Sequence, residues 1–129
     1  MTGKDYPERQ ACITGIGQTK AGRPSDRSAL QLTLDACLEA IADAGISVDD
    51  VDGLICHPGK TAEGGGISPV GTVETMMALG IRPVWTNPSS HEGPGHMAAI
   101  FQAVMEAGEK TGEKSCKESH FPSSFVIHM

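Results

Sequence analysis

The sequence predicts an α/β fold in which helices flank a short parallel sheet, and three neighbouring segments carry this prediction. Residues 11–17 are apolar and rich in glycine, which is typical of a buried strand that packs closely against its neighbours. Residues 25–44 follow an amphipathic helical pattern. Residues 52–56 form a second apolar run. A strand, a helix and a strand joined by short links predict a right-handed parallel βαβ unit.

The helix over residues 25–44 is expected to bury one face. Ser25 is the expected N-cap. Gly45 is expected to end the helix in the left-handed conformation, with Ile46 folding back over the last turn. A single helical turn capped by Ser47 is expected to follow. The predicted apolar stripe of the helix consists of Leu30, Leu34, Cys37, Leu38 and Ile41.

The second half of the chain predicts two more helices and one more strand. Residues 70–79 have a helical pattern that stops at Gly80. Residues 83–86 are expected to form a third short strand. The helix expected over residues 95–107 is apolar over much of its circumference, so it should be buried.

The sequence divides into three segments. Residues 1–10 are expected to form a flexible polar leader, and they lack the apolar run of a signal peptide. Residues 11–108 hold the expected α/β elements, whereas residues 109–129 form a tail of different character. Within the middle segment, residues 57–69 are a long loop of the kind that either binds ligands or is poorly ordered. Residues 121–129 could form a short strand that pairs with a sheet edge left open after the third strand.

Charge and composition exclude several classes of protein. The net charge of −6 argues against a nucleic-acid partner, because neutralising phosphates requires clustered Lys and Arg side chains. No apolar run approaches the length of a membrane span. Widely spaced cysteines in a chain of this kind are expected to be buried free thiols in a reducing, cytoplasmic compartment. They are Cys12, Cys37, Cys56 and Cys116.

Two short motifs do not complete the sites that they suggest. His91 and His96 are separated by five positions and by Pro94, whereas paired zinc ligands on one helical face are four positions apart. Gly59-Lys60-Thr61 lacks the preceding glycine of a phosphate loop, because position 54 is Leu. The sequence therefore predicts no metal site and no bound cofactor.

Two other motifs carry a family resemblance. Gly15-Ile16-Gly17-Gln18-Thr19 and Asp50-Val51-Asp52-Gly53-Leu54 resemble the start of thiolase-superfamily proteins, above all the sterol-carrier-protein-X or lipid-transfer branch. The resemblance covers about residues 11–108 and implies a partial thiolase-like N-terminal domain. It also implies an acyl-CoA thioester as substrate and a homodimer or a partner subunit. The tail departs from the family, whose downstream His and Cys motifs have no counterpart here.

The resemblance places the nucleophile in the turn before the helix at residues 95–107. In thiolases a cysteine lies there, where backbone N–H groups and the helix dipole stabilise a thiolate and a developing oxyanion. This turn has no cysteine. Counting forward from Asn87 places Ser90 in the nucleophile position, whereas counting back from Gly108 places His91 there, and both registers remain open. Ser90 also suits the N-cap of the helix, and His91 suits an exposed loop.

The resemblance therefore leaves two interpretations of function. The main one is the N-terminal fragment of an acyl-CoA C-acyltransferase, inactive by itself because covalent catalysis needs both a nucleophile and a base. The alternative is a subunit of a retro-aldolase that lacks the nucleophilic cysteine and acts on CoA thioesters of steroid side chains, or a module that only mediates interactions. In the retro-aldolase, acid–base groups would come from downstream residues, and the helix terminus would still serve the thioester oxygen.

Overall fold

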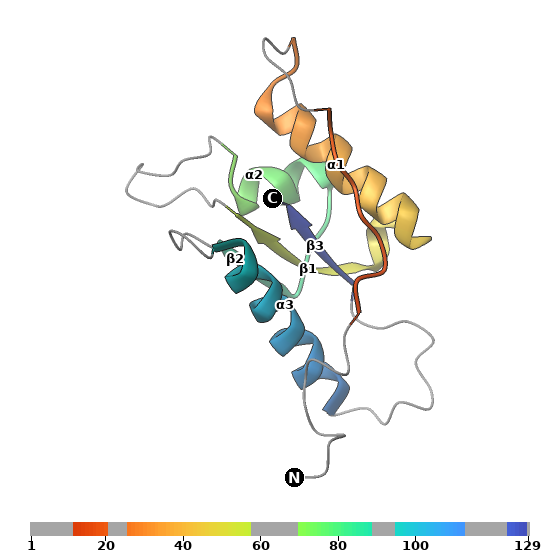
Figure 1. Cartoon of the computed structure of the whole chain (residues 1–129), viewed down its shortest axis with the longest axis vertical. Helices are drawn as coiled ribbons and strands as arrows, with labels where there is room; N and C mark the ends of the chain where they lie inside the picture. The colour runs from red at the N-terminus through yellow and green to blue at the C-terminus, as the bar shows by residue number, and fades with distance from the viewer. Residues whose placement is uncertain (1–11, 21–25, 58–69, 89–94, 113–123, 129) are drawn as a thin grey trace.

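A computed structural model describes residues 12–20, 26–57, 70–88, 95–112 and 124–128 (Figure 1). The predicted α/β class is confirmed, and the sheet is parallel. In chain order the elements are helix α1 (Ala29–Ala44), the 3-10 turn η2 (Val48–Asp50), strand β1 (Val51–Cys56), helix α2 (Thr72–Leu79), strand β2 (Trp85–Pro88), helix α3 (Gly95–Gly112) and strand β3 (Ser124–His128).

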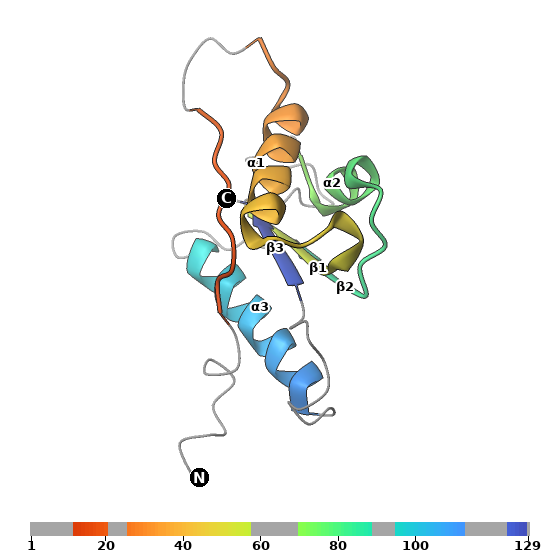
Figure 2. The same ribbon diagram turned by 90° about the vertical axis from the view of Figure 1, so that its right-hand side faces the viewer.

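Strand β1 is the centre of the sheet, whose order is β2-β1-β3. Gly53 pairs with Trp85 on one side and with Phe125 on the other. Helices α1 and α2 pack together on one face, and α3 covers the other (Figures 1 and 2). Because both faces are covered, β1 is apolar along most of its length. The core between the sheet and the first two helices consists of Cys37, Ile41, Val51, Leu54, Cys56 and Ile81.

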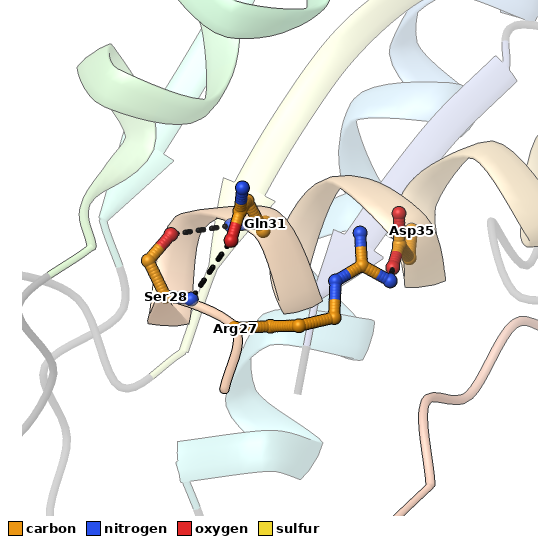
Figure 3. A network of polar contacts seen from close by, with 4 residues as sticks. All are labelled: Arg27, Ser28, Gln31 and Asp35. Atoms are coloured by element: carbon orange, nitrogen blue, oxygen red, sulfur yellow. Dashed lines mark hydrogen bonds and ion pairs between the residues drawn. The ribbon is translucent and has the colours of Figure 1, made fainter. Parts of the chain in front are cut away.

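Helix α1 begins at Ala29, so Ser28 rather than Ser25 is its N-cap. The Ser28 hydroxyl accepts a hydrogen bond from the Gln31 amide at 3.2 Å, and the Gln31 side chain accepts one from the Ser28 amide at 2.9 Å (Figure 3). This reciprocal capping box satisfies two amide donors at the exposed helix end. Arg27, just before the N-cap, forms an ion pair with Asp35 in the second turn of the helix.

The buried face of α1 is rotated from the predicted stripe. Thr33, Cys37 and Ile41 are buried, whereas the expected core residue Leu38 is exposed. The hydroxyl of Thr33 donates to the carbonyl of Ala29 at 2.9 Å, which lets a polar residue lie on the buried face. The predicted stripe was misplaced because it was drawn from the spacing of the large apolar residues alone, and a threonine was not considered as a core residue.

The strand expected over residues 11–17 does not form. Residues 12–20 run instead as an irregular segment along α1, with Ile13 and Ile16 74% and 71% exposed. The close approach predicted for the two glycines is nevertheless present. A Cβ atom on Gly15 would overlap the backbone of α1 at Ala40, and one on Gly17 would overlap it at Ala36. The partner of the glycines is a helix rather than a strand.

Glycine ends both α1 and α2, as predicted. Gly45 and Gly80 have φ angles of 70° and 71°, in the left-handed region that favours glycine. The Ile46 amide then bonds to the carbonyl of Ile41 at 3.3 Å, so the chain folds back over the last turn. The turn that begins after Ser47 is also present, and the Ser47 amide donates to the carboxylate of Asp50 at 2.8 Å. That bond lowers the pKa of Asp50.

Helix α3 differs most from its prediction. It runs to Gly112, and its buried residues are small: Ala99 and Ala103 pack toward the sheet. The large apolar residues Met97, Phe101 and Met105 are each more than half exposed, so the expected burial of this face is wrong. No helix in the described ranges is long and apolar enough to cross a membrane. The three-segment division at residues 10 and 108 stays a prediction.

Candidate functional site

The candidate site lies where β1 and β2 end and α3 begins. Parallel sheets bind ligands beyond the carboxyl ends of their strands, and helix N-termini offer unpaired amide groups to anions and polarised oxygens. His57 follows directly after β1, β2 ends at Pro88, and α3 starts at Gly95. The predicted site residues Ser90 and His91 lie outside the described residues, so their roles stay predictions.

Two imidazole side chains meet at this end of the sheet. His57 is 8% exposed, and His96, the second residue of α3, is exposed. Their ring centroids are 4.4 Å apart with an interplanar angle of 61°, which is an edge-to-face contact. One histidine is therefore buried against the protein, while the other faces solvent beside the first turn of α3.

Gly95 makes this arrangement possible. A Cβ atom at this position would overlap the His57 ring, because the imidazole lies directly against the Gly95 backbone. Any larger residue would have to displace either the histidine or the start of α3. The glycine therefore lets β1 place an imidazole against the N-terminus of the helix, where it can donate or accept a hydrogen bond.

The buried thiols near the site are not activated. Burial raises the pKa of Cys56, although side-chain hydrogen bonding with Thr75 and Thr72 opposes the shift. The Cys56 thiol lies 3.9 Å from the Thr75 hydroxyl, which itself donates to the Gly71 carbonyl at 2.9 Å. Burial also raises the pKa of Cys37 to about 12, with a further contribution from Cys56. Because the thiolate is the reactive form, neither residue suits nucleophilic catalysis.

The cysteine prediction is therefore right in part. Cys37 and Cys56 are buried free thiols, whereas Cys12 is free but exposed, because the segment that carries it is not a strand. Cys116 lies outside the described residues. Within the described ranges, no three His, Cys, Asp or Glu side chains gather closely enough to hold a metal ion.

His57 belongs to none of the motifs in the sequence, and His96 belongs only to the incomplete zinc motif. The contact between His57 and Gly95 joins residues from different elements, so no local pattern reveals it. One signal was present in the sequence: a histidine directly after a buried strand, and a helix that begins with glycine. Each feature is common alone, and only the fold brings them together.

Comparison with known proteins gives three informative relatives, although no protein-family model matches the chain. A steroid side-chain-cleaving aldolase of Thermomonospora curvata is 50% identical over 52 residues, which are 40% of this chain and 13% of the aldolase. A 17-hydroxy-3-oxo-4-pregnene-20-carboxyl-CoA lyase of Mycobacterium tuberculosis is 56% identical over 45 residues, which are 35% of this chain and 12% of the lyase. A solved Ltp2-ChsH2(DUF35) aldolase matches 76% of this chain and 24% of its own, with a TM-score of 0.62 and 32% identity.

These relatives favour the alternative interpretation over the main one. All three are named as aldolases or lyases and none as an acyltransferase, so the acyltransferase expectation gains no support from them. They do not confirm the sterol-carrier-protein-X branch either. The fold is shared over three quarters of this chain, and the chain spans only an eighth to a quarter of each relative's length. The chain is therefore similar to one part of enzymes named as aldolases and lyases.

Proposed function

We propose that the chain is the N-terminal part of a retro-aldolase that cleaves the CoA thioester of a steroid side chain. The observation that supports this proposal most is the placement of His57 and His96 at the N-terminus of α3, at the carboxyl ends of two parallel strands. The names of the relatives supply the reaction class and the CoA thioester. The raised pKa values of the buried thiols Cys37 and Cys56 agree with a reaction that needs no covalent acyl-enzyme.

The proposed chemistry is a retro-aldol cleavage of a β-hydroxyacyl thioester. A base takes the proton of the β-hydroxyl group, and the bond between the α and β carbons breaks as that oxygen becomes a carbonyl. The electron pair of the broken bond passes to the α carbon and the thioester oxygen as an enolate, which an acid then protonates. The described residues would stabilise the charge on the thioester oxygen through helix amide groups and an imidazole N–H.

The base and the acid of this reaction would come from the downstream motifs of the family, which have no counterpart in this chain. Full activity would therefore need the rest of the enzyme or a partner subunit, as the two names in the solved Ltp2-ChsH2(DUF35) aldolase suggest. We propose such a partner for this chain and expect the chain alone to bind thioester without turning it over. The buried free thiols Cys37 and Cys56 are in keeping with a reducing, cytoplasmic location.

A calorimetric titration of the purified chain with 17-hydroxy-3-oxo-4-pregnene-20-carboxyl-CoA tests the proposal. We expect saturable binding that Gly95→Ala and His96→Ala each weaken about two- to tenfold, because losing a hydrogen bond to an uncharged group such as the thioester carbonyl costs about 0.5–1.5 kcal/mol. Gly112→Ala, at the other end of the same helix, is the matched control and should bind normally. Binding that is absent, or unchanged by both site variants, would count against the proposal.

The same preparation separates the two enzyme classes. We expect no cleavage of acetoacetyl-CoA by the chain, because the nucleophile and the downstream base are missing. Measurable cleavage that is abolished by Ser90→Ala or His91→Ala would instead favour the acyltransferase.

A further inference from the structure

The edge of β1 that faces away from β2 is occupied by a strand from much later in the sequence. Strand β3 pairs with β1 in parallel, from Val51 opposite Ser124 to Cys56 opposite His128. Helix α1 packs over β3 on one face, and α3 contacts it on the other (Figure 2). A strand in this position is therefore enclosed between two helices.

Chain topology assigns the same position to a different segment. In a right-handed βαβ unit the first strand lies parallel to the second, and the helix that joins them covers both. Residues 12–18 precede α1, and β1 follows it, so the place beneath α1 beside β1 suits residues 12–18. A strand covered on both faces needs apolar side chains on both. Ile13 and Ile16, three positions apart, would supply one to each face.

In the present arrangement residues 12–18 run along α1, on the side away from α2 (Figure 2). The amide of Ile16 donates to the carboxylate of Asp43 at 2.9 Å, and the amide of Gln18 donates to that of Glu39 at 3.1 Å. The two donors are two residues apart in the segment, and the two acceptors are about one helical turn apart on α1. Both separations are about 6 Å, so the two bonds can form together. Both bonds are exposed to solvent, and they hold the segment extended with its isoleucines in water.

We propose that residues 12–18 and β3 are alternative occupants of the same edge of β1. The chain then has two sheet arrangements, in which one segment pairs with β1 while the other is released. Entry of residues 12–18 breaks the bonds to Asp43 and Glu39, buries Ile13 and Ile16, and forms a ladder of backbone hydrogen bonds. The proposal concerns the fold alone and does not depend on the proposed function.

Blocking β3 in the full-length chain tests the exchange. Proline has no amide hydrogen and therefore cannot donate a backbone hydrogen bond. Because the amides of successive strand residues point to opposite sides, one of residues 126 and 127 must face β1. The double substitution Val126→Pro and Ile127→Pro therefore removes one bond to β1. We expect hydrogen–deuterium exchange of residues 13–18 to slow at least tenfold in this variant, while β1 stays protected. Unchanged exchange at residues 13–18, or a chain that no longer folds, would overturn the proposal.

Two further variants show that any protection comes from the exchange of strands. Lys117→Pro combined with Glu118→Pro places two prolines before β3 and should leave residues 13–18 exchanging as in the wild type. Ile13→Ala combined with Ile16→Ala should leave the wild-type melting temperature unchanged, because both side chains are exposed there. The same pair added to the β3-blocked chain should reverse the slowed exchange. If the pair has no effect in that background, residues 12–18 have not entered the sheet.

Discussion

Helices α1 and α3 cover opposite faces of β1, yet they bury different kinds of residue. Helix α1 packs through Cys37 and Ile41, which belong to the same core as Leu54. Helix α3 approaches the sheet through Ala99 and Ala103, whereas its large apolar residues Met97, Phe101 and Met105 are more than half exposed. Small residues permit close backbone approach but bury little apolar area, so the two faces should contribute unequally to stability. The apolar character of a helix thus indicates neither which face is covered nor by how much.

The largest expected effect is at the α1 face. Ile41→Ala removes a side chain that is 5% exposed and leaves a cavity beside Leu54 and Cys37. We expect the free energy of unfolding to fall by about 2–5 kcal/mol, from lost burial and the cavity together. Urea titration followed by circular dichroism measures this change. A loss below about 1 kcal/mol would mean that the α1 face is as loosely packed as that of α3.

The thiol on the same face predicts a pH dependence. The folded pKa of Cys37 is about 12, above its ordinary value of 9.0, so the unfolded chain loses this proton first as pH rises. The contribution of the Cys37 thiol to the free energy of unfolding is complete below pH 9. Between pH 9 and 12 this contribution declines by up to about 1.4 kcal/mol per pH unit. Urea titrations at pH 8 and pH 10 should show the decline in the wild type and a smaller one in Cys37→Ala. If the free energy of unfolding declined equally with pH in the wild type and in Cys37→Ala, water would reach the α1 face of the sheet.

The smallest effect is expected on the outer face of α3. Phe101 is 59% exposed, so Phe101→Ala should change the free energy of unfolding by about 0.5 kcal/mol or less. This substitution removes more atoms than Ile41→Ala, which makes the pair a direct test of the contrast between the helices. A loss comparable with that of Ile41→Ala, measured by the same titration at several protein concentrations, would place Phe101 in a buried contact.

Local signals predicted much of the fold. The stops at Gly45 and Gly80 follow from a helical pattern that ends in glycine, and β1 follows from an apolar run one residue shorter than the strand itself. The helix start was misplaced at Ser25, although Ser28 and Gln31 carry the spacing of a capping box. Strand β2 begins at Trp85, two residues after its predicted start, and α2 begins at Thr72, also two residues late.

The remaining differences depend on contacts between distant residues. A glycine-rich apolar segment such as residues 12–17 fits both a strand and a chain lying on a helix, and here β3 occupies the edge of β1 while Gly15 and Gly17 lie against α1. The candidate site likewise depends on a contact between residues that are distant in the sequence. Its imidazole pair exists because a residue after β1 meets the first residue of α3, and Ser90 and His91 stay predictions.

The parallel pairing of β1 also bears on how the chain folds. Both neighbours of β1 lie later in the sequence, and β3 is separated from it by α2, β2 and α3. Pairing over such separations must first overcome the entropy of closing a long loop, so the sheet forms more slowly than the helices. On the ribosome residues 12–18 emerge before β1, and β3 emerges after α3. During synthesis the edge of β1 is therefore open to the earlier segment well before β3 exists.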